Sequence, residues 1–92
     1  MNFDWDHSKN EINIRKHDID FFEAAKVFKD PHYIVNEDNR HNYDETRYQI
    51  IGAVAPHGVL FVVYTERQKD TVRIISARQA TKKECRLYQQ NI

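Results

Sequence analysis

The chain has 92 residues and a mass of 11.1 kDa, which is enough for one small domain with a single core. Fourteen basic residues balance fourteen acidic ones and 40% of the residues are hydrophobic, whereas disordered chains carry a large net charge and few apolar residues. The longest apolar run, 59–64, is far shorter than the roughly 20 residues of a membrane-spanning helix. A lone cysteine, Cys85, excludes an internal disulfide and a cysteine metal cluster. We therefore expect a single domain over residues 1–92 in a reducing compartment, the cytoplasm, with no membrane segment.

The neutral total charge hides an asymmetry along the chain. Residues 1–65 contain seven Lys or Arg and eleven Asp or Glu, a balance of −4, whereas residues 66–92 contain seven and three, a balance of +4. A C-terminal third this basic can face a polyanion such as a nucleic acid. A solvated helix face and strand edge would have the same composition, so both interpretations stay open at this stage.

Two helices are predicted in the first third of the chain. Asp6 is a suitable N-cap for a helix from about His7 to His17, and the basic residues of its last turn suit the negative end of the helix dipole. Asp20 starts a capping box, after which apolar residues recur at helical spacing as far as Phe28. Pro31 ends this second helix, because proline disfavours helical backbone in the residue before it.

Strand-forming segments dominate the middle of the chain. The predicted strands are 32–35, 47–54, 59–65 and 71–77, of which the last three form consecutive hairpins. Thr81 and Glu84 then form a capping box for a helix that ends near Gln90. These helices and strands, with an antiparallel meander before the last helix, predict an α+β fold with helices packed on an antiparallel sheet. The expected core is Trp5, Phe21, Ala25, Phe28, Ile50, Leu60, Val62, Ile74 and Leu87.

Several classes of site are excluded by the residues that the chain lacks. Its histidines include no His-x-x-x-His pair and have no cysteine pair near them, so no metal site is expected. The two glycines, Gly52 and Gly58, cannot form a glycine-rich phosphate loop. Neither serine, Ser8 or Ser76, lies in the sequence context of a nucleophile elbow.

Charged residues are concentrated at the end of the meander. Glu66 and Arg67 end one strand, and Arg73 and Arg78 flank the apolar centre of the next. Adjacent antiparallel strands bring such positions within reach of one another, so the arginines can bind a phosphodiester in bidentate fashion while a carboxylate accepts a proton. The competing interpretation is a set of ordinary cross-strand salt bridges at the sheet edge.

Two further polar segments can contribute to the same place. Lys16 and His17 end the first helix, and Arg40 and His41 lie in the long polar loop that precedes Arg47. Metal-free cleavage of RNA needs a base for the 2′-hydroxyl proton, cations for the crowded phosphorane and an acid for the leaving 5′-oxygen. Glutamate, histidine, lysine and arginine side chains can perform these functions. Taken singly, each of these residues is more often a cap, a turn residue or a solvated charge.

Several short motifs, in a fixed order, give the chain a family resemblance. The most specific blocks are Tyr64-Thr65-Glu66-Arg67 and Arg73-Ile74-Ile75-Ser76-Ala77-Arg78, and the Asp4-Trp5-Asp6 start and the Lys16-His17 helix end strengthen them. With these blocks the chain resembles the BrnT toxin family from about residue 3 to residue 89.

The resemblance implies a bacterial ribonuclease toxin with a RelE-like α+β fold and a C-terminal helix. Such a toxin is a metal-independent endoribonuclease that uses no cofactor and inhibits translation by cutting RNA. The resemblance also implies a BrnA-like ribbon-helix-helix antitoxin, with two toxins bound to an antitoxin dimer. Because the chain has no helix-turn-helix pattern, zinc finger or basic zipper, operator DNA is expected to bind only through the antitoxin.

The site hypothesis assigns these roles to individual residues. Arg67 and Arg78 are expected to clamp the phosphate, because a planar guanidinium meets two phosphate oxygens and keeps its charge. Glu66 or His17 is expected to act as the base. The expected substrate contacts are Lys16, Arg40, His41, Arg47 and Arg73.

Two alternative functions fit the same sequence, and two positions depart from the family pattern. A non-catalytic RNA- or protein-binding module, or a small structural partner whose basic third is only an interface, would show the same sequence. Cleavage of RNA in EDTA would distinguish the enzyme from both. Asp18 stands where the family often has a glycine, so the first helix is expected to end differently, and Asp44 replaces a common glycine ahead of Arg47.

Overall fold

The computed structural model describes residues 1–40 and 44–92, so the predicted substrate contact His41 lies outside the described residues. No helix in this described part of the chain is long and apolar enough to cross a membrane. In chain order the elements are β1 (Asn2–Trp5), α1 (His7–His17), α2 (Phe21–Ala24), the 3₁₀ helix η1 (Ala25–Lys29), β2 (Ile34–Glu37), β3 (Arg47–Val54), β4 (Gly58–Arg67), β5 (Thr71–Gln79) and α3 (Lys82–Gln90).

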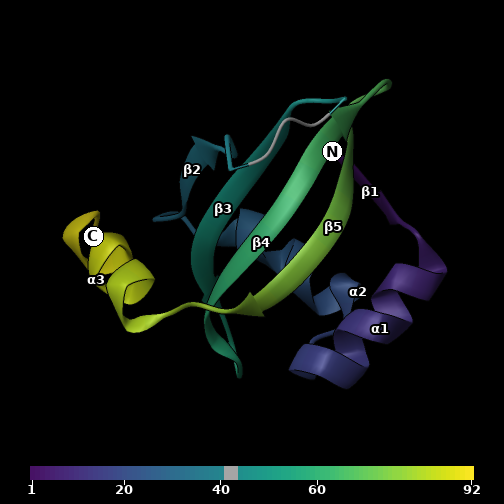
Figure 1. The fold of residues 1–92 in the computed structure, drawn as a ribbon. Coiled ribbons are helices and arrows are strands. Elements are labelled where there is room, and N and C mark those ends of the chain that lie inside the picture. The colour runs from purple at the N-terminus through teal and green to yellow at the C-terminus, as the bar shows by residue number, and fades with distance from the viewer. Residues whose placement is uncertain (41–43) are drawn as a thin grey trace.

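A five-stranded sheet forms the centre of the molecule, with the strand order β1-β5-β4-β3-β2. Strands β2 to β5 pair in antiparallel fashion, whereas β1 pairs with β5 in parallel. Figure 1 shows α2 passing behind the sheet and α3 lying to one side, beside the end where β5 finishes. The predicted α+β architecture with a C-terminal helix is confirmed, and the parallel pairing of β1 is an addition to it.

The sheet is apolar on both faces, and different helices cover the two faces. Leu60 and Val62 of β4 are fully buried in the larger core, to which α2 and η1 contribute. The alternate residues Phe61 and Val63 form a smaller cluster on the other face with Tyr88 of α3. Burial from both sides explains why the apolar sequence of β4 does not alternate with polar residues.

Two buried asparagines attach α1 to the rest of the fold. The Asn13 side chain donates to the carbonyl oxygens of Ile19 and Ala77, both at 2.9 Å, and accepts from the Ala77 N–H at 3.1 Å. Asn10 accepts from the Phe21 N–H at 2.8 Å. These asparagines are the buried residues of α1, so their hydrogen bonds decide where the basic end of this helix lies relative to β5.

The helix termini follow the predicted capping residues, with one correction. The Asp6 side chain accepts from an N–H of the first turn of α1, and Thr81 and Glu84 form the reciprocal capping box of α3. Asp18 adopts the left-handed conformation that glycine favours, with φ 59° and ψ 34°. The expectation that α1 ends differently from a glycine-terminated helix is therefore wrong, because aspartate tolerates this backbone region.

Some boundaries and core positions differ from the prediction. The predicted second helix is α-helical only over Phe21–Ala24 and then tightens into η1, as helices often do in their last turn. Leu87 is 45% exposed and Tyr88 is buried in its place, because the Tyr88 hydroxyl donates to Asp30 and so determines how α3 is rotated. Ala25, Trp5 and Phe28 are only half-buried. The remaining predicted core residues are buried: Phe21, Ile50, Leu60, Val62 and Ile74.

Candidate active site

The sheet face that α3 shares carries a row of arginines. Arg47 of β3 and Arg73 of β5 both lie opposite Thr65 of β4, so their side chains point to the same face of the sheet. Arg67 lies two residues further along β4 and points the same way, as does Arg78, which lies opposite Phe61. Arg47, Arg67, Arg73 and Arg78 are referred to below as the arginine face.

A β-bulge is responsible for the arrangement of the two β5 arginines. Strict alternation along a strand would put Arg73 and Arg78 on opposite faces, because they are an odd number of residues apart. The β4–β5 register shifts between Val63 and Tyr64, so that β5 has an extra residue there. Arg73 and Arg78 therefore point to the same face.

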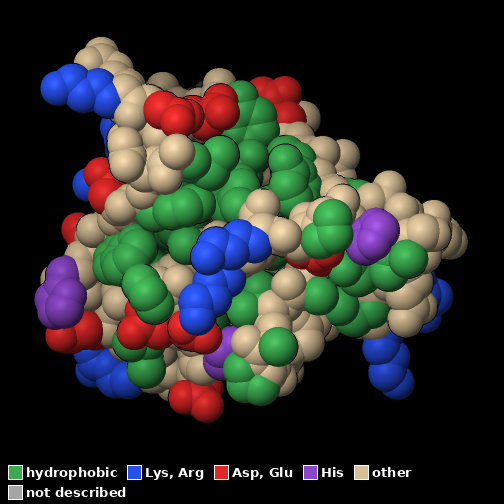
Figure 2. All heavy atoms as spheres, turned by 180° about the vertical axis from the view of Figure 1, so that it is seen from behind, with side chains coloured by type: hydrophobic (Ala, Val, Ile, Leu, Met, Phe, Trp, Pro, Cys, Tyr) green, Lys and Arg blue, Asp and Glu red, His purple; other side chains and the backbone are tan. Residues whose placement is uncertain are grey.

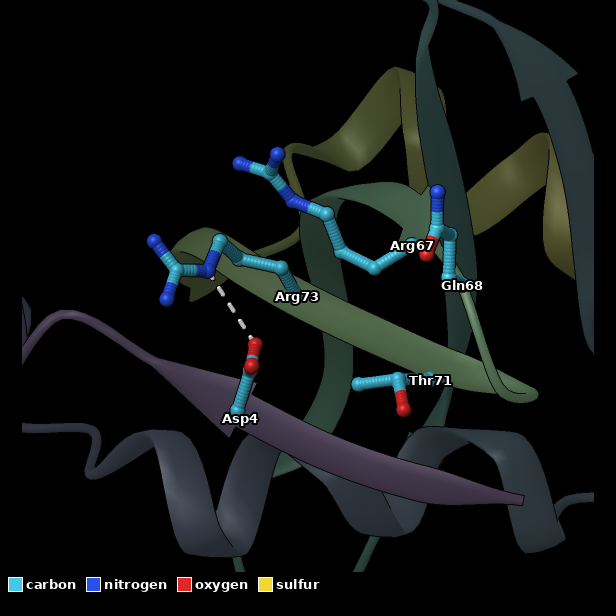
Figure 3. Close-up of a pocket in the computed structure, with 5 residues that line it drawn as sticks. All are labelled: Asp4, Arg67, Gln68, Thr71 and Arg73. Carbon is cyan, nitrogen blue, oxygen red and sulfur yellow. Dashed lines mark hydrogen bonds and ion pairs between the residues drawn. The ribbon is translucent and has the colours of Figure 1, made fainter.

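Arg67 and Arg73 line an open pocket of about 460 Å³ beside the β4–β5 turn, together with Asp4, Gln68 and Thr71. Arg73 Nε donates to Asp4 Oδ1 at 3.1 Å. Figure 3 shows the two guanidinium groups extending to the same side, with the terminal nitrogens of Arg73 directed away from Asp4. The side chains of Arg67 and Arg73 are 46% and 38% exposed, so an anion can reach both.

Glu45 links two of the arginines from the loop before β3. Its carboxylate oxygens lie 3.4 Å from Arg47 Nε and 3.4 Å from Arg67 Nη2. All three side chains are partly exposed, so solvent screens these ion pairs and each contributes little stability. The bridge nevertheless holds Arg47 and Arg67 beside one another and offsets part of their positive charge.

Arg78 is held by α3 and by an aromatic ring. Its two terminal nitrogens donate to the Glu84 carboxylate at 2.8 and 3.0 Å, and its guanidinium carbon lies 4.0 Å from the centre of the Phe61 ring. The hydrogen bonds from Arg78 hold the pKa of Glu84 below its usual range, although burial acts in the opposite direction. The predicted phosphate clamp is therefore paired with a carboxylate in the free protein.

A second arginine contacts the same aromatic ring. The Arg40 guanidinium lies 5.6 Å from the centre of the Phe61 ring, and it donates to the buried Asp38 carboxylate at 2.8 and 2.9 Å. Gln49 donates to this carboxylate at 3.1 Å. These hydrogen bonds, that of the Arg40 side chain above all, hold the pKa of Asp38 well below its usual range. Arg40 is thus a cation oriented by a buried acid beside the arginine face.

Lys16 and His17 reach the edge of β5 from the last turn of α1. They line a small pocket of about 190 Å³, whose other lining residues are Lys9, Ile12, Asn13, Ile75 and Ser76. Ser76 lies between Arg73 and Arg78 along β5 and opposite Val63, on the arginine side of the sheet. The structure therefore brings Lys16 and His17 beside the middle of the arginine face.

Glu66 points away from the arginine face. It lies opposite Val72, and burial together with the Glu66 charge raises the pKa of Tyr64 to about 12. Val72 and Tyr64 both belong to the core cluster on the α2 side of the sheet. Glu66 and Arg67 therefore point to opposite faces of the sheet, because side chains alternate along a strand, and the role of Glu66 as a base stays a prediction.

Several residues that shape this site were not predicted. Asp4, Glu45 and Glu84 pair with its arginines, and Asn13 positions the helix that carries Lys16 and His17. Glu84 was expected only as a capping residue. Ion pairs such as that between Asp4 and Arg73, which are 69 positions apart, leave no periodic signal in a sequence.

The fold and the site define a small α+β protein with a cationic sheet face, partly neutralised by carboxylates and suited to an anionic polymer. Among the described residues, no group of three or more His, Cys, Asp or Glu side chains could hold a metal ion. The family model for the ribonuclease toxin BrnT of type II toxin-antitoxin systems matches residues 5–84. The chain belongs to this family.

The chain is similar in fold to the Brucella abortus ribonuclease toxin BrnT, whose crystal structure has a resolution of 1.1 Å, with a TM-score of 0.69 and 24% identity. The match covers 89% of this chain and 99% of the Brucella chain. No curated protein matches the sequence significantly.

Proposed function

We propose that this BrnT-family toxin is a metal-independent endoribonuclease that inhibits translation, and that its RNA substrate lies along β5. The observation that carries the proposal is the alignment of Arg67, Arg73 and Arg78 on one sheet face, with the pocket of Lys16 and His17 beside its middle. Because of the bulge, Arg73 and Arg78 lie opposite residues of β4 that are only four positions apart, a span of about 13 Å at roughly 3.3 Å per residue. This length accommodates more than one backbone phosphate of a nucleic-acid strand.

Arg67 and Arg73 are the first contacts that we assign to the RNA backbone. Both line the open pocket at the β4–β5 turn, and both keep guanidinium nitrogens toward solvent. A guanidinium fork binds two phosphate oxygens at once and keeps its charge at any physiological pH. Arg47 and Arg40 add positive charge beside this path without leaving their own carboxylate partners.

His17 is the residue that we assign as the base, in preference to Glu66 on the opposite face. His17 accepts the proton of the 2′-hydroxyl while the 2′-oxygen attacks phosphorus. A cyclic 2′,3′-phosphate forms, the bond from phosphorus to the 5′-oxygen breaks, and the protonated Lys16 amine gives a proton to that oxygen. Arg78 stabilises the additional negative charge of the phosphorane.

Arg78 must exchange partners to act in this way. In the free protein Glu84 accepts from both of its terminal nitrogens, and the Phe61 ring supports the guanidinium plane. A phosphate that enters beside Ser76 competes with Glu84 for these nitrogens. The Phe61 ring keeps the guanidinium plane oriented while phosphate replaces Glu84, so Arg78 itself needs little reorientation when charge develops.

Membership of a type II toxin-antitoxin family implies a cognate antitoxin. We expect a BrnA-like ribbon-helix-helix antitoxin, a complex of two toxins with an antitoxin dimer, operator DNA bound only through the antitoxin, and action on RNA in the cytoplasm. Light scattering of the purified complex tests the stoichiometry. A gel shift with operator DNA tests the division of labour, which specific binding by the toxin alone would contradict.

The direct test is cleavage of RNA by the purified protein in excess EDTA. Alanine at Arg78 should lower the rate about 10²–10³-fold, the usual cost of removing one donor that stabilises the transition state. Alanine at His17 should lower the cleavage rate about 10²–10⁴-fold, and the cleavage rate of this variant should no longer depend on pH through a general base. Arg15→Ala on α1 and Arg86→Ala on α3 are matched controls, because both arginines are exposed and lie outside the arginine face.

The possible outcomes separate the alternatives. Near-normal cleavage by all the site variants would reject the assignment, and a need for added magnesium would reject the mechanism. Retention of RNA without cleavage would favour a non-catalytic binding module of the same fold. Loss of cleavage in Glu66→Gln with normal rates in His17→Ala would return the role of base to Glu66.

A further inference from the structure

An apolar groove lies on the other side of β1 from the arginine face. It has a volume of about 460 Å³ and runs between β1 and the α2–η1 segment. Phe3, Trp5, Phe22 and Ala25 supply its apolar lining, with Met1 and Asn2 at one end. Figure 2 shows hydrophobic side chains gathered on this side of the molecule, with basic side chains lying across them.

Two large apolar side chains that line the groove are exposed to solvent. Phe22 is 63% exposed and Met1 is 66% exposed. Phe22 lies in the first turn of α2, next to Phe21, which is fully buried. Exposed phenylalanine at the mouth of an apolar groove is typical of a protein-binding surface, because a partner that covers it removes apolar area from water.

The rim of the groove is positively charged. Lys26 and Lys29 line it from η1, and Lys26 Nζ lies 5.5 Å from the centre of the Phe22 ring. Glu23 pairs with Lys26 at 2.7 Å, but among the described residues none that lines the groove carries a carboxylate. The charge of the rim therefore suits a partner segment with carboxylates beside its apolar side chain.

The strand beside the groove is also open to pairing. Among the described residues, β1 is an edge strand that pairs with β5 alone. Its residues alternate between the two sites: Phe3 and Trp5 line the groove, whereas Asp4 lines the pocket of Arg73. A segment anchored in the groove can therefore add to the edge of β1 and pass across it to the arginine side, a known mode of peptide recognition.

We propose that this groove is the docking site for an acidic segment of the cognate antitoxin that inserts a bulky apolar side chain beside Phe22 and places carboxylates near Lys26 and Lys29. The proposal rests on the proposed function for the identity of the partner. It separates two surfaces: the groove supplies antitoxin affinity, and the arginine face supplies RNA cleavage. Variants of the groove should weaken neutralisation and leave cleavage by the free toxin unchanged.

The test measures binding of the purified cognate antitoxin to purified variants of the full chain by calorimetry. Phe22→Ala should weaken the affinity at least tenfold, a change equivalent to about 1.4 kcal/mol. The double variant Lys26→Glu, Lys29→Glu should weaken the affinity more at low salt than at high salt, because salt screens the charges across the interface. Overlapping peptides of the antitoxin should locate the segment, and the peptide that binds should contain an apolar residue flanked by Asp or Glu.

Matched controls and a second measurement keep the result interpretable. Leu87→Ala removes a comparably exposed apolar side chain from α3, and Lys83→Glu reverses an exposed charge there. Both should bind the antitoxin as the wild type does. Circular dichroism checks folding, and RNA cleavage by Phe22→Ala should stay within about twofold of wild type, since Phe22 lies outside the arginine face.

Several results would overturn the proposal. Wild-type affinity in both groove variants would do so, as would an equal loss of affinity in the α3 controls. A wild-type toxin that forms a dimer alone and becomes monomeric in Phe22→Ala would assign the groove to a second copy of this chain. Absence of RNA cleavage by the wild type would refute the proposed function instead, because calorimetry reads the docking site without any activity.

Discussion

Asn13→Ala should be among the most damaging single substitutions in α1, although it removes a polar side chain from a polar helix. The side chain is 6% exposed and makes hydrogen bonds to the Ile19 carbonyl, the Ala77 carbonyl and the Ala77 N–H. At about 1 kcal/mol for each, with buried backbone groups left unsatisfied, the expected loss is about 3 kcal/mol. For a domain of 92 residues the total free energy of unfolding is of the order of 5–14 kcal/mol.

Urea denaturation followed by circular dichroism measures this loss directly. Thermal unfolding should show a decrease in Tm of about 12–24 °C, at roughly 4–8 °C per kcal/mol for a domain of this size. Ile12→Ala is the control, because its side chain is 55% exposed on the neighbouring position of α1. It should change the free energy of unfolding by less than about 0.5 kcal/mol.

The substitution has a functional consequence as well. Asn13 joins α1 to β5 at Ala77, next to Ser76 and the pocket of Lys16 and His17. RNA cleavage by Asn13→Ala should therefore fall even at temperatures where the variant is folded. A loss of less than about 1 kcal/mol in stability, or one no larger than that of Ile12→Ala, would refute the view that this asparagine holds the helix on the sheet.

Three smaller predictions concern the ends of helices and a close contact. Asp18→Gly should raise the free energy of unfolding by about 0.5–1 kcal/mol, because glycine adopts φ 59° without strain. A lower free energy of unfolding than that of the wild type, measured by urea denaturation, would contradict this. Arg78 lowers the pKa of Glu84, so this ion pair stabilises the folded state above about pH 4.3, and the stabilisation is lost as the pH falls further. Glu84→Gln should remove this part of the acid sensitivity, which denaturation curves at several pH values measure. Gly52→Ala would place its Cβ 2.7 Å from Val27 Cγ2 in the core, so calorimetry should show a loss of about 1–3 kcal/mol, and an unchanged Tm would refute the contact.

The local elements of this protein could be predicted from its sequence. Asp6 and Thr81 start helices where the capping rules place them, and the hairpins of β3, β4 and β5 follow the apolar segments. Such signals are local, because a cap or a strand period involves residues a few positions apart. The motif blocks also led to the BrnT family, whose model matches residues 5–84.

The composition of the site, by contrast, depends on contacts between distant residues. Asp4 pairs with Arg73 and Glu84 with Arg78 only after β1 and α3 reach β5. Asn13 supplies side-chain hydrogen bonds to β5 that no helical pattern reveals. Each of these residues had another adequate explanation within its own segment, such as a cap or a solvated charge.

The direction in which the charged side chains point was decided by tertiary structure alone. By strand alternation Arg73 and Arg78 would point to opposite faces, and it is the bulge in the β4–β5 ladder that turns them to one face. Glu66 lies next to Arg67 in the sequence but faces the opposite core, opposite Val72. The sequence therefore indicated most of the candidate charged residues, whereas register and packing, which couple residues far apart in the chain, decided which of them meet.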